Sequence, residues 1–178
     1  DALARAARDD SAAFAELYRR HLSAVYRYLL VRAGDVFHAQ DLTSQTFLVA
    51  FERISSYRGP NTFAAWLLTI ARNAHIDAVR QRTRQRTVAL DVALAVASQA
   101  PPPDHIIGAR LDLEQVVRGV RGLAPERAEV VALRVFGQLS TAETARVLGK
   151  SEAAVKMLLH RGLHDLRDRL AFLDEPEA

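Results

Sequence analysis

Residues 62–86 read TFAAWLLTIARNAHIDAVRQRTRQR, and this stretch decides the fold of the N-terminal half of the chain. Its apolar side chains recur at the period of one helical face. That face consists of Phe63, Trp66, Leu67, Ile70, Ala71, Ala74 and Ala78. Thr62 precedes the run and can cap a helix. The sequence therefore predicts one long amphipathic helix.

The other face of this helix is basic. It carries five arginines against a single acid, Asp77, so its net charge is +4. The arginines are Arg72, Arg80, Arg82, Arg84 and Arg86, with Asn73 among them. Guanidinium groups pair well with phosphates, so a helix of this kind suits a polyphosphate surface. The alternative is a core helix whose charged face is only solvated.

Two more helices are predicted upstream. Asp10 or Ser11 can begin the first, and Gly34 can end it. Its apolar line is Phe14, Leu17, Tyr18, Leu22, Val25, Tyr26, Leu29 and Leu30. Asp35 can cap the second, whose apolar line is Ala39, Leu42, Thr43, Thr46, Phe47, Ala50, Phe51 and Ile54. No stretch shows sustained strand alternation, so an all-helical domain is expected.

Residues 89–109 are predicted to be a flexible linker. Periodicity fails there, and Pro101–Pro103 cannot continue a helix and favours extended backbone. The predicted domains are therefore residues 1–88 and 110–178. Residues 1–88 hold 13 Lys and Arg against 8 Asp and Glu, and the remainder holds 11 against 13. The N-terminal domain is thus the more basic and the better candidate for contact with nucleic acid.

The C-terminal domain is also predicted to be helical. Helices are expected from Leu113 to Gly122 and from Pro125 to Gly137. Residues 141–160 then have the anatomy of a helix-turn-helix, with a capping box at Ser140 and Glu143 and a turn at Gly149. The outward residues of its second helix would be Ser151, Glu152, Ala154, Lys156, Met157, His160, Arg161 and His164. Such a helix can enter a major groove, whereas the alternative is an ordinary helical hairpin.

No constellation of catalytic residues is apparent. The 178 residues contain no cysteine, no glycine-rich phosphate loop and no nucleophile elbow. His160 and His164 stand four apart, but no third metal ligand is suggested nearby. We therefore expect no enzyme activity, no metal and no cofactor. No apolar run reaches the roughly 18–20 residues that span a bilayer, and no signal peptide is visible, so a cytoplasmic protein without membrane insertion is expected.

Short motifs follow one another in order along both domains. The first domain has Asp41-Leu42 with Phe47, Phe63-x-x-Trp66-Leu67, and Ala71-Arg72-Asn73 with Asp77 and Arg80. The second has Leu123-Ala124-Pro125-Glu126-Arg127, Leu139-Ser140-x-x-Glu143, Val147-Leu148-Gly149, Val155-Lys156 and Leu159-His160-Arg161. In this order and spacing they resemble the extracytoplasmic-function sigma factors, the minimal branch of bacterial RNA polymerase sigma subunits. The resemblance extends from about Phe14 to Leu170.

The resemblance implies a protein that binds core RNA polymerase, at its clamp and flap regions, and directs promoter recognition, DNA opening and transcription initiation. The clamp would be bound by the second helix, through Asp41, Leu42, Gln45 and Phe47. The family pattern Asp-Leu-x-Gln-Glu-x-Phe appears here without its glutamate, which removes one charge from this face. The alternative role for Asp41 is to support the N-terminus of its helix. An anti-sigma protein is a further partner that the resemblance implies.

The resemblance also assigns the DNA contacts. The loop 55–61 and its flanks would capture an unpaired minus-ten base, through Tyr57, Arg58, Asn61, Phe63 and Trp66, although Phe63 and Trp66 also fit a core position. The upstream backbone would be held by Arg72, Asn73, Arg80 and Arg84. The minus-thirty-five element would be read by Ser151, Glu152, Ala154, Lys156, His160 and Arg161. Met157 and Leu158 stand where relatives often carry Ser and Arg.

A stand-alone transcriptional regulator is the closer rival hypothesis. A C-terminal helix-turn-helix would explain residues 110–170 equally well, with the first domain sensing a ligand or a partner. It does not explain the arginine-rich face and the aromatic loop of the first domain. Tight binding to duplex DNA without polymerase would favour the regulator, because a sigma factor is expected to bind duplex poorly on its own.

Overall fold

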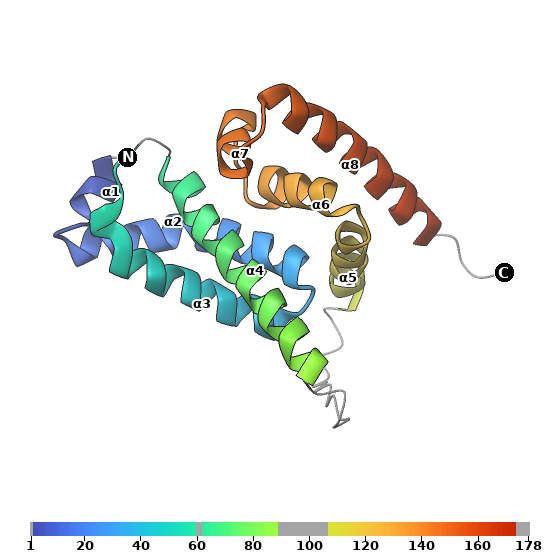
Figure 1. Ribbon diagram of the computed structural model, residues 1–178, viewed down its shortest axis with the longest axis horizontal. Coiled ribbons are helices and arrows are strands. Elements are labelled where there is room, and N and C mark those ends of the chain that lie inside the picture. Colours follow the sequence, from blue (N-terminus) through green and yellow to red (C-terminus); the bar gives the residue numbers. More distant parts are fainter. Residues whose placement is uncertain (1, 60–61, 89–106, 174–178) are drawn as a thin grey trace.

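The computed structural model describes residues 2–59, 62–88 and 107–173, and all regular structure within these ranges is helical (Figure 1). The predicted linker lies outside the described residues except for positions 107–109, which are already helical. The elements are α1 (Ala2–Ala6), α2 (Ser11–Ala33), α3 (Val36–Arg53), η1 (Ile54–Ser56), α4 (Phe63–Val88), α5 (Ile107–Arg121), α6 (Pro125–Val131), η4 (Ala132–Phe136), α7 (Thr141–Leu148) and α8 (Glu152–Leu173). The all-helical fold class is thus confirmed.

The helix boundaries in the N-terminal half follow from local capping. The Asp10 carboxylate accepts a hydrogen bond from the Ala12 amide and begins α2. Gly34 ends it in the left-handed region, with a φ of 76° and its amide donating to the Leu30 carbonyl. Asp35 then caps α3 through the His38 amide. The short helix α1 was not predicted, because five residues are too few to show a period.

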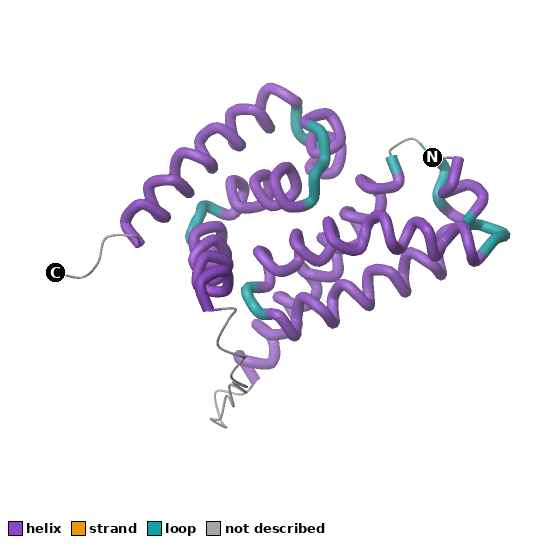
Figure 2. The backbone as a smooth tube through the Cα atoms, turned by 180° about the vertical axis from the view of Figure 1, so that it is seen from behind, coloured by secondary structure: helices purple, strands orange, loops and turns teal. Residues whose placement is uncertain are grey.

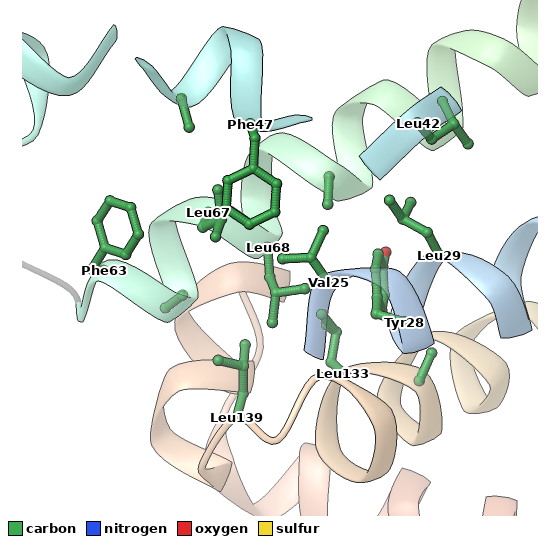
Figure 3. Close-up of a cluster of buried hydrophobic side chains, with 14 of the residues drawn as sticks. Val25, Tyr28, Leu29, Leu42, Phe47, Phe63, Leu67, Leu68, Leu133 and Leu139 are labelled. Atoms are coloured by element: carbon green, nitrogen blue, oxygen red, sulfur yellow. The ribbon is translucent and has the colours of Figure 1, made fainter. Parts of the chain in front are cut away.

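The N-terminal half is a bundle of α2, α3 and α4, with α1 packed on α2. Figure 3 shows Val25 and Leu29 of α2, Phe47 of α3, and Leu67 and Leu68 of α4 pointing into one core. Phe51, predicted to be buried, is instead 51% exposed, with its edge against Phe14. The apolar line of α3 is therefore wider than the surface that α2 and α4 cover.

The C-terminal half contains the predicted helix-turn-helix. The capping box of Ser140 and Glu143 is present at the start of α7, and Gly149 ends α7 in the left-handed region with a φ of 62°. Ser151 accepts from the Ala154 amide and begins α8. Val155 of α8 is fully buried against Val130 and Ala145, which holds α8 across α7. The predicted helix from 125 to 137 is present, but its last part, η4, is π-helical.

The two halves share one hydrophobic core. Helix α2 packs on α5 and η4, and α4 packs on α7. Figure 3 shows Leu133 and Leu139 of the C-terminal half facing Leu68 and Val25, and all four are buried. A Cβ atom on Gly137 would come within 2.9 Å of Leu68 Cδ1, so a larger residue there would require Leu68 to shift. Figure 2 shows the same arrangement from behind, with α5 standing between α2 and α8. We call this arrangement closed.

Candidate nucleic-acid interface

The loop between η1 and α4 is built on three aromatic rings. The Tyr57 ring centroid lies 5.8 Å from that of Phe63 and 5.4 Å from that of Trp66. Tyr57 is only 1% exposed and Phe63 is also buried, whereas Trp66 is half-buried. Burial raises the pKa of the Tyr57 hydroxyl. In this conformation, Tyr57 and Phe63 support the loop from below and are not presented for stacking on a base.

Of the two polar residues predicted to contact the unpaired base, the structure describes Arg58 but not Asn61. Arg58 is exposed and donates to the Ser55 carbonyl, so its guanidinium lies at the loop surface. Asn61 lies outside the described residues. Next to it, the exposed Thr62 donates a hydrogen bond from its hydroxyl to the carboxylate of Glu143 on α7. The segment between η1 and α4 is therefore tied to the helix-turn-helix in the closed arrangement.

The basic face of α4 divides into two parts. Asn73, Arg80 and Arg84 are exposed along its outer side, with Arg80 Nη1 3.7 Å from the exposed Asp77 carboxylate. These side chains are accessible to a phosphate backbone. Arg72 is different, because it is half-buried and faces the C-terminal half.

The partner of Arg72 is Glu129, a buried acid on α6 that the sequence analysis did not single out. Its carboxylate accepts a hydrogen bond of 2.8 Å from the Tyr28 hydroxyl and lies 3.1 Å from Arg32 Nη2 and 3.4 Å from Arg72 Nε. We call Tyr28, Arg32, Arg72 and Glu129 the Glu129 cluster. Burial, followed by the nearby carboxylate, raises the pKa of Tyr28 well above its usual value, so the phenol stays protonated and donates. The sequence did offer a sign of this buried acid, because Glu129 lies within the mostly apolar segment AEVVALRVF.

The predicted groove-reading helix α8 presents a mixed polar surface. Ser151, Glu152, Lys156, His160 and Arg161 are exposed, while Ala154 is half-buried. Met157 is also exposed. Lys150 is anchored at the turn by an ion pair of 2.7 Å with Glu126. His164 pairs with Asp168 at 2.9 Å, and no group of three potential metal-binding side chains occurs in the described part of the chain.

The predicted polymerase-binding residues of α3 fall into two layers. Asp41 and Gln45 are exposed, whereas Leu42 and Phe47 are buried beneath them, with Phe47 against Tyr18 at 4.6 Å between ring centroids. The exposed apolar side chains of this helix were not predicted as contacts; they are Val36, Phe37, Leu48 and Phe51. The accessible surface of α3 therefore combines the acids Asp41 and Glu52 with several apolar side chains.

Figure 1 places the helices that carry these residues on different sides of one molecule, with α8 outermost. None of the helices in the described ranges combines the length and apolarity needed to cross a membrane. The exposed basic residues on α4 and α8 are suited to phosphate contact, and the exposed face of α3 is suited to a protein partner.

Two family models match the chain. Residues 17–85 match sigma-70 region 2, and residues 113–166 match sigma-70 region 4. The chain is 39% identical to the ECF RNA polymerase sigma factor BldN of Streptomyces coelicolor over 165 residues, which is 91% of this chain but only 62% of BldN. It is 32% identical to the ECF RNA polymerase sigma factor SigL of Mycobacterium tuberculosis, with 91% of each chain covered.

Among solved structures, the chain resembles CnrH in its complex with the cytosolic domain of CnrY. The TM-score is 0.74 at 25% identity, and 97% of both chains is covered. Because the match spans both halves, it includes the way they are packed together. With both sigma-70 regions present and a relative matched over nearly its whole length, this chain belongs to the sigma-70 family, in its extracytoplasmic-function group.

Proposed function

We propose that this protein binds core RNA polymerase and directs it to promoters, as an alternative sigma factor acting in the cytoplasm. Residues 1–88 would bind the polymerase clamp and open the minus-ten element, and residues 110–178 would read the minus-thirty-five element. The observation that carries the proposal is the presence of region 2 and region 4, in that order, with exposed basic residues on α4 and α8. We infer that it acts as an initiation factor and not as an enzyme.

Within region 2, we assign the proposed contacts to the side chains that are accessible in the structure. Arg58, together with the accessible side of Trp66 and with Asn61, would meet the unpaired strand, while Tyr57 and Phe63 hold the loop in place. Asn73, Arg80 and Arg84 would hold the upstream backbone. On α3, Asp41 and Gln45 would contact the polymerase beside the exposed Leu48 and Phe51.

Within region 4, Lys156 and Arg161 are the proposed principal contacts of α8. Both are exposed, and neither forms an ion pair within the described ranges. Ser151, Glu152 and His160 flank them, and Ala154 would allow close approach of the helix to the groove. Base contacts and phosphate contacts are separable here, because only the former depend on promoter sequence.

The closed arrangement is proposed to be an inactive form. Arg72 is turned toward Glu129 and Thr62 is bonded to Glu143, so two elements of the DNA-binding face are engaged within the protein. CnrH, whose packing is similar over its whole length, was solved with the cytosolic domain of CnrY bound. We infer that a comparable anti-sigma partner holds this protein closed, and that it opens on polymerase.

Run-off transcription tests the proposed function. Purified core RNA polymerase would be given a pool of promoter fragments with and without this protein. New specific transcripts would support the proposal, and alignment of their start regions would give both promoter elements. Failure to bind core polymerase, combined with tight binding to duplex DNA alone, would instead favour a stand-alone regulator.

A further inference from the structure

A small cavity lies where the two halves meet. It has a volume of about 110 Å³ and lies between the end of α2, the start of α3, the C-terminal part of α4 and the end of α5. Its polar lining consists of Arg32, His38, His75, Arg82 and Arg121, and its remaining lining side chains are apolar. Arg121 comes from the C-terminal half, and the other four come from the N-terminal half. We call this space the cationic cavity.

No acid from the described ranges lines the cationic cavity. Two carboxylates contact its lining residues, but both have other partners. Glu129 lies 3.1 Å from Arg32 and also accepts from Tyr28, and Asp35 lies 2.6 Å from His38 and caps α3. Arg82 and Arg121 form no ion pair within the described ranges. Three guanidinium groups therefore converge here with incomplete compensation of their charge.

His75 adds a neutral donor to this cationic set. The residue is 8% exposed, and burial, together with the charges of Arg32, Arg82 and Arg121, lowers the pKa of its ring to about 4. At neutral pH the ring is uncharged and retains one N–H. No hydrogen bond to another residue is found for this ring in the described part of the chain. The ring can therefore donate to a ligand in the cavity.

The exposed side chain of Arg121 lies close to the end of α2. It lies directly over the backbone of Gly34, where a Cβ atom would come within 2.6 Å of Arg121 Cδ. Gly34 has a φ of 76° and ends α2, so the glycine serves both the turn and this close approach. The guanidinium of Arg121 therefore lies across the boundary between the halves and lines the same cavity as Arg32 and Arg82.

We propose that the cationic cavity binds a phosphate-type oxyanion, either free phosphate or the phosphate group of a small metabolite. Guanidinium forks match the geometry of phosphate oxygens, and the volume accommodates a phosphate group while any attached moiety extends into solvent. A bound oxyanion neutralises the converging arginines and joins Arg121 to the N-terminal half. Its binding therefore favours the closed arrangement. This inference does not depend on the proposed transcriptional role.

Isothermal titration of the full chain with sodium phosphate tests the proposal, in a chloride buffer of constant ionic strength at neutral pH. We expect saturable binding with one phosphate per chain. Arg121→Gln and Arg82→Gln should each weaken it by at least about tenfold, since each removes charged hydrogen bonds to the anion. Arg82 and Arg121 are both exposed, so both variants are expected to fold. Arg118→Gln, an exposed arginine on the same helix as Arg121, is the matched control and should bind like the wild type.

Several outcomes would overturn the proposal. One is the absence of saturable binding at constant ionic strength, and another is an equal loss in Arg118→Gln, which would indicate general charge screening. Acetate binding as tightly as phosphate would indicate a carboxylate site. Displacement of phosphate by a duplex of random sequence would assign the cavity to the DNA backbone. Glycerol phosphate binding as tightly as inorganic phosphate would support the proposal with an ester as the source, and much weaker binding would support it with the free anion.

Discussion

Glu129 forms the buried polar contact between the two halves within the described ranges. It accepts from Tyr28 and pairs with Arg32 and Arg72, all from the other half of the chain. A buried ion pair contributes little compared with a well-packed apolar pair, but removing one partner leaves the other charge uncompensated. We expect Glu129→Ala to lower the free energy of unfolding by about 3–5 kcal/mol. Urea denaturation followed by circular dichroism measures it.

Two further variants distinguish the contribution of the Glu129 cluster to stability from the effect of removing any acid on α6. Tyr28→Phe removes only the phenol hydroxyl and should cost about 1–3 kcal/mol, because Glu129 keeps its arginines. Glu126→Ala removes an exposed acid of the same helix, paired with Lys150, and should change stability by less than about 1 kcal/mol. Equal effects of Glu126→Ala and Glu129→Ala would show that the cluster has no special role.

His75 makes stability depend on pH. Its pKa is about 4 in the folded protein and 6.5 ordinarily, so the unfolded chain binds the proton more readily. Its contribution is fully present above pH 6.5 and is lost as the pH falls toward 4. Between pH 7 and pH 5 we expect a loss of roughly 2 kcal/mol from this group, measured by urea unfolding at both values. His75→Gln should remove that share, and an unchanged pH dependence in this variant would contradict the assignment.

At the scale of elements, the turn between α7 and α8 requires a left-handed backbone conformation at one residue. Gly149 has a φ of 62°, and a Cβ atom added there would meet nothing within 4 Å. Gly149→Ala should therefore lower stability by roughly 1–2 kcal/mol through the left-handed conformation only. Gly149→Asn should cost less, since asparagine tolerates this region. Denaturation midpoints of the two variants test this, and equal losses would indicate crowding instead.

Helix α4 carries the proposed backbone contacts. Arg80 and Arg84 are exposed on its outer side, where each would neutralise one phosphate and release counterions. In the complex with core polymerase, the double variant Arg80→Gln and Arg84→Gln should reduce the slope of log affinity against log salt by about 2. Fluorescence anisotropy of a labelled promoter across a salt series measures the slope. An unchanged slope would mean that these arginines do not meet phosphate, and Arg118→Gln serves as the control.

The elements themselves could be predicted, because their signals are local. Asp10, Gly34 and Ser140 each act within four residues along the chain, and each cap was found where the sequence indicated it. The contact between the halves was not predicted, because Tyr28 and Glu129 are 101 residues apart. Nothing in the sequence around either residue indicates that the other is its partner. Burial of Tyr57 was missed for a similar reason, because its covering rings lie beyond the loop.

At the scale of the whole molecule, the closed arrangement and the proposed DNA contacts compete for the same groups. Arg72 cannot pair with Glu129 and hold upstream phosphate at once, and Thr62 beside the capture loop is bonded to Glu143. A duplex that binds these elements must therefore displace the C-terminal half from them. The free energy of the interface between the halves thus sets the threshold for opening.

Glu129→Gln tests this competition, because it removes the charge of the carboxylate while keeping the size of the side chain. The interface loses its ion pairs, so the population shifts toward open molecules. We expect a larger radius of gyration by small-angle X-ray scattering at unchanged helical content, together with tighter promoter binding. Glu126→Gln should change neither quantity. Tighter DNA binding at an unchanged radius of gyration would mean that the variant only releases Arg72 for DNA and does not open the molecule. No change in either quantity would mean that the interface does not limit access to DNA.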